Sequence, residues 1–201
     1  MAERKARGLL ECGAKVVVIS PELTDGLQTL LNEKRIAWQA RGYCPDDIAG
    51  AMLAIAATDD SKVQDMVVAD AERYNILVNV ADVPEKCNFI LPALVKRGDL
   101  SIAISTSGNS PALAKQLRRR FQVQVGEEYN ILNNMMGVLR PEVMGRGRSQ
   151  KENEQIFNRL LAEDMPGWIK EANWQRIKAH LDGILGTLPD NLNSCLQDMV
   201  V

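Results

Sequence analysis

The fold is decided by the first twenty residues of the chain, Met1-Ala-Glu-Arg-Lys-Ala-Arg-Gly-Leu-Leu-Glu-Cys-Gly-Ala-Lys-Val-Val-Val-Ile-Ser20. The part up to Ala14 is expected to be a helix, and the apolar run that follows is typical of a strand buried on both faces. A helix, a turn and a strand in this order form the second half of a βαβ unit. The opening strand and the glycine-rich turn of such a unit, where a dinucleotide fold usually holds pyrophosphate, do not occur in the sequence.

The same alternation of helices and strands continues to about residue 92. The predicted strands are short and apolar, and Thr58-Asp-Asp-Ser61 offers several capping residues for the helix after it. Short buried strands separated by helices indicate an α/β fold with a parallel, doubly wound, Rossmann-like sheet. The predicted strands lie at Lys15–Ser20, Ile36–Ala40, Met52–Ala57 and Ile76–Val80, and the predicted helices at Glu22–Glu33 and Lys62–Tyr74.

The pattern changes after Pro92. Leu100–Thr106 alternates apolar and small residues, as a strand that faces two environments would. In the turn that follows, Ser110 is a predicted helix N-cap and Pro111 the first helical residue. Everything from there to about Leu185 is predicted to be helical, and the tail Thr187–Val201 is predicted to be frayed. The predicted helices lie at Pro111–Gln124, Glu127–Gly145, Gln150–Glu163 and Ala172–Leu185.

Composition excludes several functional classes. The chain has 201 residues, and its net charge of −2 gives no bulk attraction to nucleic acid or to an anionic membrane. No apolar run approaches the roughly 20 residues that span a bilayer, and the N-terminus has no signal-peptide pattern, so we expect a cytoplasmic protein. Because the cysteines are scattered (Cys12, Cys44, Cys87, Cys195) and His180 is the only histidine, no protein metal site is predicted.

Two acidic residues follow predicted strands at the edge where open α/β sheets bind ligands. Asp82, in Asn79-Val-Ala-Asp-Val-Pro84, is placed to move a proton beside a bound cofactor, or simply to cap a local backbone group. Glu22 is placed to bind an adenosine ribose, or to complement the dipole of its helix. No Arg or Lys occurs in Ser20–Leu23 to receive a 2′-phosphate, so NAD is favoured over NADP.

Two further motifs have both a binding and a structural interpretation. Ser105-Thr-Ser-Gly-Asn-Ser-Pro111 is a small-residue loop leading into a helix, which suits an anion cradle and equally a capped turn. Arg118-Arg-Arg120 would suit a polycarboxylate or a nucleic acid, although a solvated helix face is the commoner explanation. His180 lies among apolar residues on a predicted helix and is given no role.

In this order and spacing, a set of short motifs resembles the siroheme synthase N-terminal family, the precorrin-2 dehydrogenase/sirohydrochlorin ferrochelatase proteins. The resemblance implies a Rossmann-like NAD-binding domain at residues 1–92, a dimerisation region at 93–125 and a helical domain at 126–201. The motifs are Ala2-Glu-Arg-Lys-Ala6, Gly13-Ala14, Ser20-Pro-Glu22, Ala57-Thr-Asp59, Asn79-Val-Ala-Asp82, Phe89-Ile-Leu-Pro92 and Leu100–Pro111.

The resemblance also implies an activity, the NAD-dependent oxidation of precorrin-2 to sirohydrochlorin by a homodimer; some members also insert Fe²⁺. The substrate is then a small-molecule tetrapyrrole, and neither nucleic acid nor membrane is an expected partner. Asp82 matches the family's acid/base residue, and Thr106 matches a position that is a modified serine in some members. On this basis we assign cofactor binding to Met1, Ser20, Pro21, Glu22, Thr58, Asp59 and Asn79, and substrate binding to Thr106, Ser107, Gly108, Asn109 and Ser110.

The sequence departs from the family pattern at its start. Members carry a strand and a Gly-Gly-Gly-x-Val turn directly before Ala-Glu-Arg-Lys, and here Met1 stands at the place of that valine. We therefore expect about 20–25 residues, a strand and the pyrophosphate turn, to precede Met1 in the working protein. The alternatives left open are a dimer that binds a tetrapyrrole or a nucleotide without catalysis, and a nucleotide-sensing regulatory domain.

Overall fold

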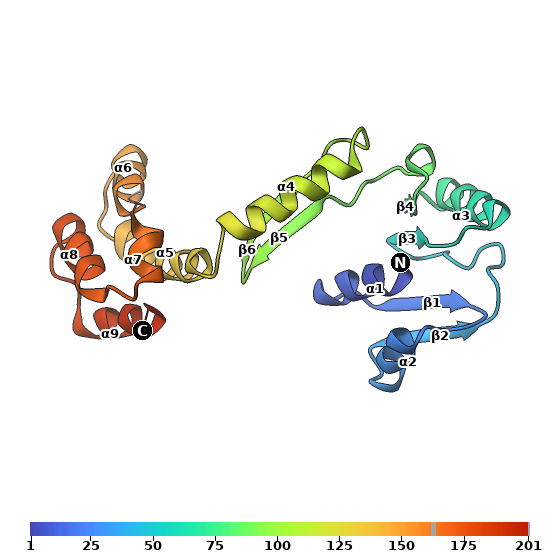
Figure 1. Cartoon of the computed structure of the whole chain (residues 1–201), viewed down its shortest axis with the longest axis horizontal. Helices are drawn as coiled ribbons and strands as arrows, with labels where there is room; N and C mark the ends of the chain where they lie inside the picture. The colour runs from blue at the N-terminus through green and yellow to red at the C-terminus, as the bar shows by residue number, and fades with distance from the viewer. Residues whose placement is uncertain (162–163, 201) are drawn as a thin grey trace. The chain divides into compact units, whose positions relative to one another are not determined.

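The computed structural model describes residues 1–161 and 164–200. The chain divides into two compact units, an N-terminal unit of Met1–Leu91 and a C-terminal unit that begins at Pro92 (Figure 1). None of the described helices is long and apolar enough to cross a membrane.

The N-terminal unit alternates helices and strands, as predicted. Its strands form two parallel pairs, β1 with β2 (Val16 opposite Ile36) and β3 with β4 (Leu53 opposite Leu77). Within the described backbone, no hydrogen-bonded ladder joins one pair to the other. The elements are α1 (Ala2–Glu11), β1 (Val16–Ser20), α2 (Asp25–Asn32), β2 (Ile36–Ala40), β3 (Leu53–Ala56), α3 (Ser61–Tyr74), β4 (Leu77–Val80) and the short 3₁₀ turn η1 (Pro84–Lys86).

Each strand pair has its own hydrophobic core. Ala6 of α1 and two leucines of α2, Leu27 and Leu30, are buried together with Ile36 of β2. Residues of α3, including Val67 and Ala71, are buried against the β3–β4 pair. Helices that pack on parallel strands in this way give a Rossmann-like α/β arrangement, and the predicted fold class is therefore confirmed.

The predicted helix Glu22–Glu33 begins three residues late, at Asp25. Thr24 is its N-cap, because the Thr24 hydroxyl accepts a hydrogen bond from the Leu27 amide. The residues before it form a turn in which the Ser20 hydroxyl donates to the Glu22 carbonyl at 2.7 Å. Glu22 therefore lies in this turn and not in the helix.

The C-terminal unit begins with an antiparallel hairpin, β5 (Ala93–Arg97) and β6 (Leu100–Ile104), in which Ala93 lies opposite Ile104. Helix α4 (Pro111–Gln124) packs on the hairpin, and Val95 is buried at 2% exposure. The start of α4 at Pro111, capped by Ser110, confirms the prediction. Strand β5 was not predicted, because its apolar run is only three residues long and is followed by Lys96 and Arg97.

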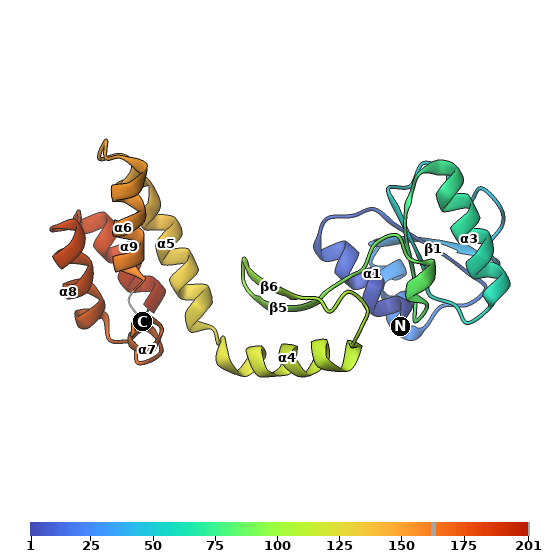
Figure 2. The same cartoon turned by 90° about the horizontal axis from the view of Figure 1, so that it is seen from above.

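The rest of the C-terminal unit is helical, as expected (Figure 2). The predicted helix Gln150–Glu163 ends at Leu160, and residues 162 and 163 lie outside the described residues. A short helix that was not predicted, α7, follows. The helices are α5 (Glu128–Met144), α6 (Gln150–Leu160), α7 (Met165–Lys170), α8 (Trp174–Leu185) and α9 (Asp190–Val200).

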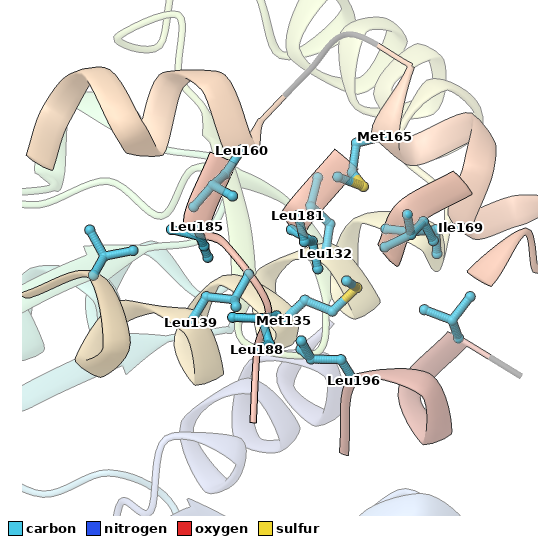
Figure 3. Packing of buried hydrophobic residues seen from close by; sticks show 13 residues of the cluster. Leu132, Met135, Leu139, Leu160, Met165, Ile169, Leu181, Leu185, Leu188 and Leu196 are labelled. Carbon is cyan, nitrogen blue, oxygen red and sulfur yellow. The ribbon is translucent and has the colours of Figure 1, made fainter. Parts of the chain in front are cut away.

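The prediction of a frayed tail at Thr187–Val201 is wrong. Residues 190–200 form α9, and Val201 lies outside the described residues. Leu196 is completely buried in the core that α5–α9 share (Figure 3). The apolar spacing Leu188, Leu192, Leu196 was present in the sequence, but the Asn and Ser residues between these leucines are weak helix formers. Burial of the apolar stripe outweighs that weakness.

The position of Leu196 gives a stability prediction. Leu196→Ala removes a fully buried side chain from the helical core, so we expect it to lower the free energy of unfolding by about 2–5 kcal/mol. Urea denaturation followed by circular dichroism measures the change. Leu161→Ala is the matched control, because Leu161 is 46% exposed. An equal effect of the two substitutions would show that α9 is not part of the core.

Candidate functional site

The first turn of α1 is contacted from two sides. The Glu3 carboxylate accepts a hydrogen bond from the hydroxyl of Thr24, which ends the turn after β1, at 3.4 Å. The Lys5 ammonium donates to the side-chain carbonyl of Asn79, on β4, at 3.1 Å. The start of α1 therefore lies between the turn after β1 and the end of β4.

The segment after β3 lies beside the segment after β4. Ala56 and Val80 are opposite each other in the parallel pair, and the Ala81 amide donates to the Ala56 carbonyl at 2.9 Å. Asp60 caps α3 by accepting from the Lys62 amide, and the buried Gln64 donates to the Thr58 carbonyl at 2.8 Å. This segment is thus fixed to the first turns of α3.

These contacts bring together most of the residues that the sequence singled out. In an open α/β sheet, ligands bind beyond the carboxyl ends of the strands. Here the segments that follow β1, β3 and β4 lie next to the first turn of α1, at this same edge of the strands. The residues gathered are Met1, Ser20, Pro21, Glu22, Thr58, Asp59, Asn79 and Asp82.

The start of α1 has the properties of an anion site. Met1 is the N-cap residue, and its side chain makes no capping hydrogen bond. The first amides of a helix have no partner within the helix, and the helix dipole favours negative charge beside them. The amides of Ala2, Glu3 and Arg4 therefore suit the pyrophosphate of a dinucleotide.

The turn after β1 is held by two hydrogen bonds and leaves Glu22 exposed. The indole nitrogen of Trp38 donates to the Ser20 carbonyl at 2.9 Å, and the Ser20 hydroxyl holds the Glu22 carbonyl. Glu22 itself is exposed. A carboxylate on a fixed turn beside a helix N-terminus can accept hydrogen bonds from ribose hydroxyls.

Asp82 is exposed and has an unusual backbone. Its φ of 61° lies in the left-handed region, which non-glycine residues seldom occupy and which Asp tolerates better than most. Its carboxylate makes no hydrogen bond to any of the residues that the structure describes. The local capping role that the sequence left open is therefore not observed, and the carboxylate remains available for proton transfer.

The segment after Asp82 is tied back onto β4. The Asn88 side chain accepts from the Val78 amide at 2.6 Å and donates to the Ile76 carbonyl at 3.0 Å, so it takes the place of a neighbouring strand. The Cys87 sulfur accepts from the Val80 amide at 3.1 Å. Sequence reasoning missed both residues, because neither forms a recognisable motif.

The sequence analysis assigned cofactor binding to Asn79. In the structure, the Asn79 side chain forms hydrogen bonds with other protein groups. It is only 7% exposed; its carbonyl accepts from Lys5, and its amide nitrogen donates to the Phe89 carbonyl at 3.1 Å. Asn79 therefore links α1 to the segment that follows Asp82. The sequence alone gave no individual role to Lys5, because its partner Asn79 lies 74 positions away in the chain.

Among the groups of this site, the Lys5 ammonium has a pKa that departs clearly from its ordinary value. Partial burial lowers the pKa of the Lys5 ammonium, and the neighbouring Arg4 lowers it further. The charges of Cys87 and Asp82 act in the opposite direction. Asp82 is thus close enough to Lys5 for their charges to interact.

The predicted substrate loop lies in the C-terminal unit and is folded on itself. The Thr106 hydroxyl accepts from the Ser110 amide at 3.1 Å, and the Thr106 carbonyl accepts from the Asn109 amide at 2.9 Å. Ser107 and Gly108 both have positive φ, which closes the turn. The described residues contain no cluster of His, Cys, Asp or Glu able to hold a metal ion.

Comparisons with known proteins identify the family of the chain. Residues 1–93 match a family described as "Putative NAD(P)-binding", and residues 97–124 match "Sirohaem biosynthesis protein central". Siroheme synthase 3 of Aeromonas hydrophila subsp. hydrophila is 36% identical over 167 residues, which are 83% of this chain and 36% of that protein. Siroheme synthase of Nitrosococcus oceani is 37% identical over 194 residues, 94% of this chain and 41% of that protein. The chain thus spans well under half the length of these relatives.

A solved structure of SirC, precorrin-2 dehydrogenase, is similar to this one with a TM-score of 0.71, and the match covers 89% of each chain. At 23% identity this likeness shows the fold. With the two family matches and the siroheme synthase relatives, it shows that the chain belongs to the siroheme synthase N-terminal family.

Proposed function

We propose that this chain oxidises precorrin-2 to sirohydrochlorin with NAD⁺ as the oxidant. The observation that carries the proposal is the position of the first turn of α1, between the Ser20–Glu22 turn and the segment of Asp82. This arrangement offers an anion site, a ribose-binding carboxylate and an acid/base carboxylate within one unit. The siroheme synthase relatives supply the substrate class.

The reaction needs few protein groups. Precorrin-2 loses two electrons and two hydrogens: one leaves as hydride and the other as a proton. NAD⁺, when bound, supplies the hydride acceptor. The Asp82 carboxylate accepts the proton and releases it to solvent, which its exposed position allows. The overall products are sirohydrochlorin, NADH and one proton.

The other assigned residues bind and orient the cofactor. The first amides of α1 hold the pyrophosphate, and Glu22 binds the adenosine ribose. Because the segment 20–23 contains no cation to receive a 2′-phosphate, we propose NAD as the cofactor in place of NADP. Thr58 and Asp59 contribute from the segment after β3. The insertion of Fe²⁺ into sirohydrochlorin remains a prediction that rests on the resemblance to the siroheme synthase N-terminal family.

We also propose that residues 93–125 form a homodimer interface. Side chains alternate between the two faces of a strand, so the buried Val95 and the exposed Leu94 face opposite ways. Leu94 lies opposite Ala103 of β6 and is 46% exposed. The exposed face of the hairpin thus carries the apolar pair Leu94 and Ala103 beside the polar pair Lys96 and Ser101. A two-stranded sheet is only marginally stable alone, which a second copy packed on the apolar pair would remedy. The dimer is proposed to act in the cytoplasm, where the free thiols of the chain stay reduced.

The catalytic assignment is tested by Asp82→Asn. We expect this variant to lose about 10²–10⁴-fold in kcat, because the carboxylate that accepts the proton is gone while the shape of the side chain is kept. NADH formation from precorrin-2, followed at 340 nm, measures the loss. NAD binding, measured by calorimetry, is expected to be unchanged.

Asp198→Asn, at an exposed position of α9, is the matched control and is expected to keep full activity. Turnover by Asp82→Asn equal to that of this control would contradict the role of Asp82. Binding of NAD and of precorrin-2 by the wild-type protein without any turnover would favour the non-catalytic binding dimer.

The interface is tested by Leu94→Glu. A carboxylate on the open face of the hairpin would be buried in the dimer without a partner, so we expect this variant to be monomeric. Light scattering coupled to gel filtration measures the mass, which is expected to be that of two chains for the wild type. Met66→Glu, at an apolar position of 36% exposure on α3, is the control. A monomeric wild-type protein, or a dimeric Leu94→Glu variant, would contradict the assignment.

A further inference from the structure

We propose that helix α4 carries a docking site for the carboxylates of the tetrapyrrole substrate. The inference rests on the proposed function, because that function supplies a substrate with many carboxylates. We call the residues of this site the cationic face of α4; they are Lys115, Arg118, Arg119 and Arg120.

Positive charge is concentrated on this part of the chain. Residues 92–125 hold six of the 24 Lys and Arg residues but only one of the 26 Asp and Glu residues, Asp99. The chain as a whole is slightly acidic, with a net charge of −2. Four of the six cations lie on α4, and this helix contains no acidic residue. Helix α4 therefore departs from the charge of the chain that contains it.

The cations of α4 are neighbours on the helix surface. Lys115 and Arg119 are four positions apart, and Arg118 is three positions from Lys115, so their side chains can reach the same ligand. Like charges at these spacings destabilise a helix. The helix dipole does not compensate for this repulsion, because no basic residue lies in the last turn of α4. A bound anion would compensate for it.

The protein itself supplies no counter-ion to these charges. In the described part of the chain, no carboxylate forms an ion pair with a cation of α4. Arg97 of β5 differs, since its guanidinium donates to the Gln122 carbonyl at 2.7 Å and lies 3.6 Å from the Glu127 carboxylate. Arg97 thus fastens the end of α4 to the hairpin, whereas Lys115 and Arg119 are exposed and available to a ligand.

The cationic face begins close to the loop to which substrate binding is assigned. Helix α4 follows the loop 106–110 directly, and Ser110 of that loop is the N-cap of the helix. Lys115 therefore lies within two helical turns of the loop. The proposed dimer leaves the outer side of α4 open, because α4 packs on the hairpin face that buries Val95, and Leu94 lies on the opposite face.

A compact polyanion fits the cationic face better than a nucleic acid does. The four cations fall within six consecutive positions, which are less than two turns of helix. The rest of the chain has more acidic than basic residues and would repel an extended phosphate backbone. In a tetrapyrrole, the carboxylate side chains are gathered around one ring, which matches so short a span of charge.

A binding assay without turnover tests the cationic face. The probe is uroporphyrin III, a stable tetrapyrrole with acetate and propionate side chains, and its fluorescence reports binding to the full chain. In Lys115→Gln/Arg119→Gln we expect the Kd to rise about 3–10-fold, since each exposed ion pair contributes only modestly. Added salt is expected to weaken binding to the wild type more than binding to this variant. Glutamine is a good helix former, so α4 is expected to stay folded, which circular dichroism checks.

The matched control removes two exposed cations from α6 of the same unit, in Lys151→Gln/Arg159→Gln, and is expected to bind uroporphyrin III as the wild type does. An unchanged Kd in Lys115→Gln/Arg119→Gln, or an equal rise in the control, would overturn the inference. So would a loss of affinity for a DNA oligonucleotide in the α4 variant without any loss of affinity for uroporphyrin III.

Steady-state kinetics separate failure of this inference from failure of the proposed function. In the α4 variant we expect the KM for precorrin-2 to rise about 3–10-fold with little change in kcat, because docking contacts hold substrate and transition state equally. If the wild type shows no turnover but uroporphyrin III binding depends on the α4 cations, the docking site stands and the dehydrogenase assignment fails. If the enzyme is active and both KM and Kd are unchanged in the variant, the docking site is overturned and the assignment stands.

Discussion

The hydrogen bond from Lys5 to the buried side chain of Asn79 joins two parts of the N-terminal unit that otherwise have separate cores. Helices α1 and α2 pack with β1 and β2, and α3 packs with β3 and β4. No strand ladder connects the two pairs among the residues that the structure describes. The Lys5–Asn79 bond therefore links the first turn of α1 to the strand that leads to Asp82. The proposed anion site lies on the α1 side of this contact, and the proposed acid/base residue Asp82 follows β4 on the other side.

The first turn of α1 uses its side chains for contacts within the protein and leaves its backbone amides without a side-chain cap. Glu3 and Lys5 extend from the same turn of α1 in different directions, toward Thr24 and Asn79. The amides of that turn are left for an anion, because no side chain caps them. The left-handed backbone of Asp82 is maintained by Asn79, Cys87 and Asn88, which fasten the loop to β4. Strain of this kind persists only where the surroundings hold it in place.

Local sequence patterns predicted most of the fold, and the errors have physical causes. Continuous apolar runs identified the four parallel strands, and Ser110-Pro111 fixed the start of α4, because strand burial and helix capping are local properties. Helix α9 was missed because its stability comes from burying Leu196 against distant helices, which propensity does not record. In the site, Asp82 and Glu22 could be found from their places after strands. Lys5 and Asn88 could not, since their roles come from contacts that only the folded chain creates.

The function proposed for this chain requires that the first turn of α1 and the segments around it form a dinucleotide site. The most direct test is a titration of ¹⁵N-labelled protein with NAD⁺, followed by amide chemical shifts. We expect the largest changes at Ala2, Glu3 and Arg4 and in the segments 20–24, 57–60 and 81–83. Changes concentrated elsewhere, with the first turn of α1 unaffected at saturating NAD⁺, would contradict it.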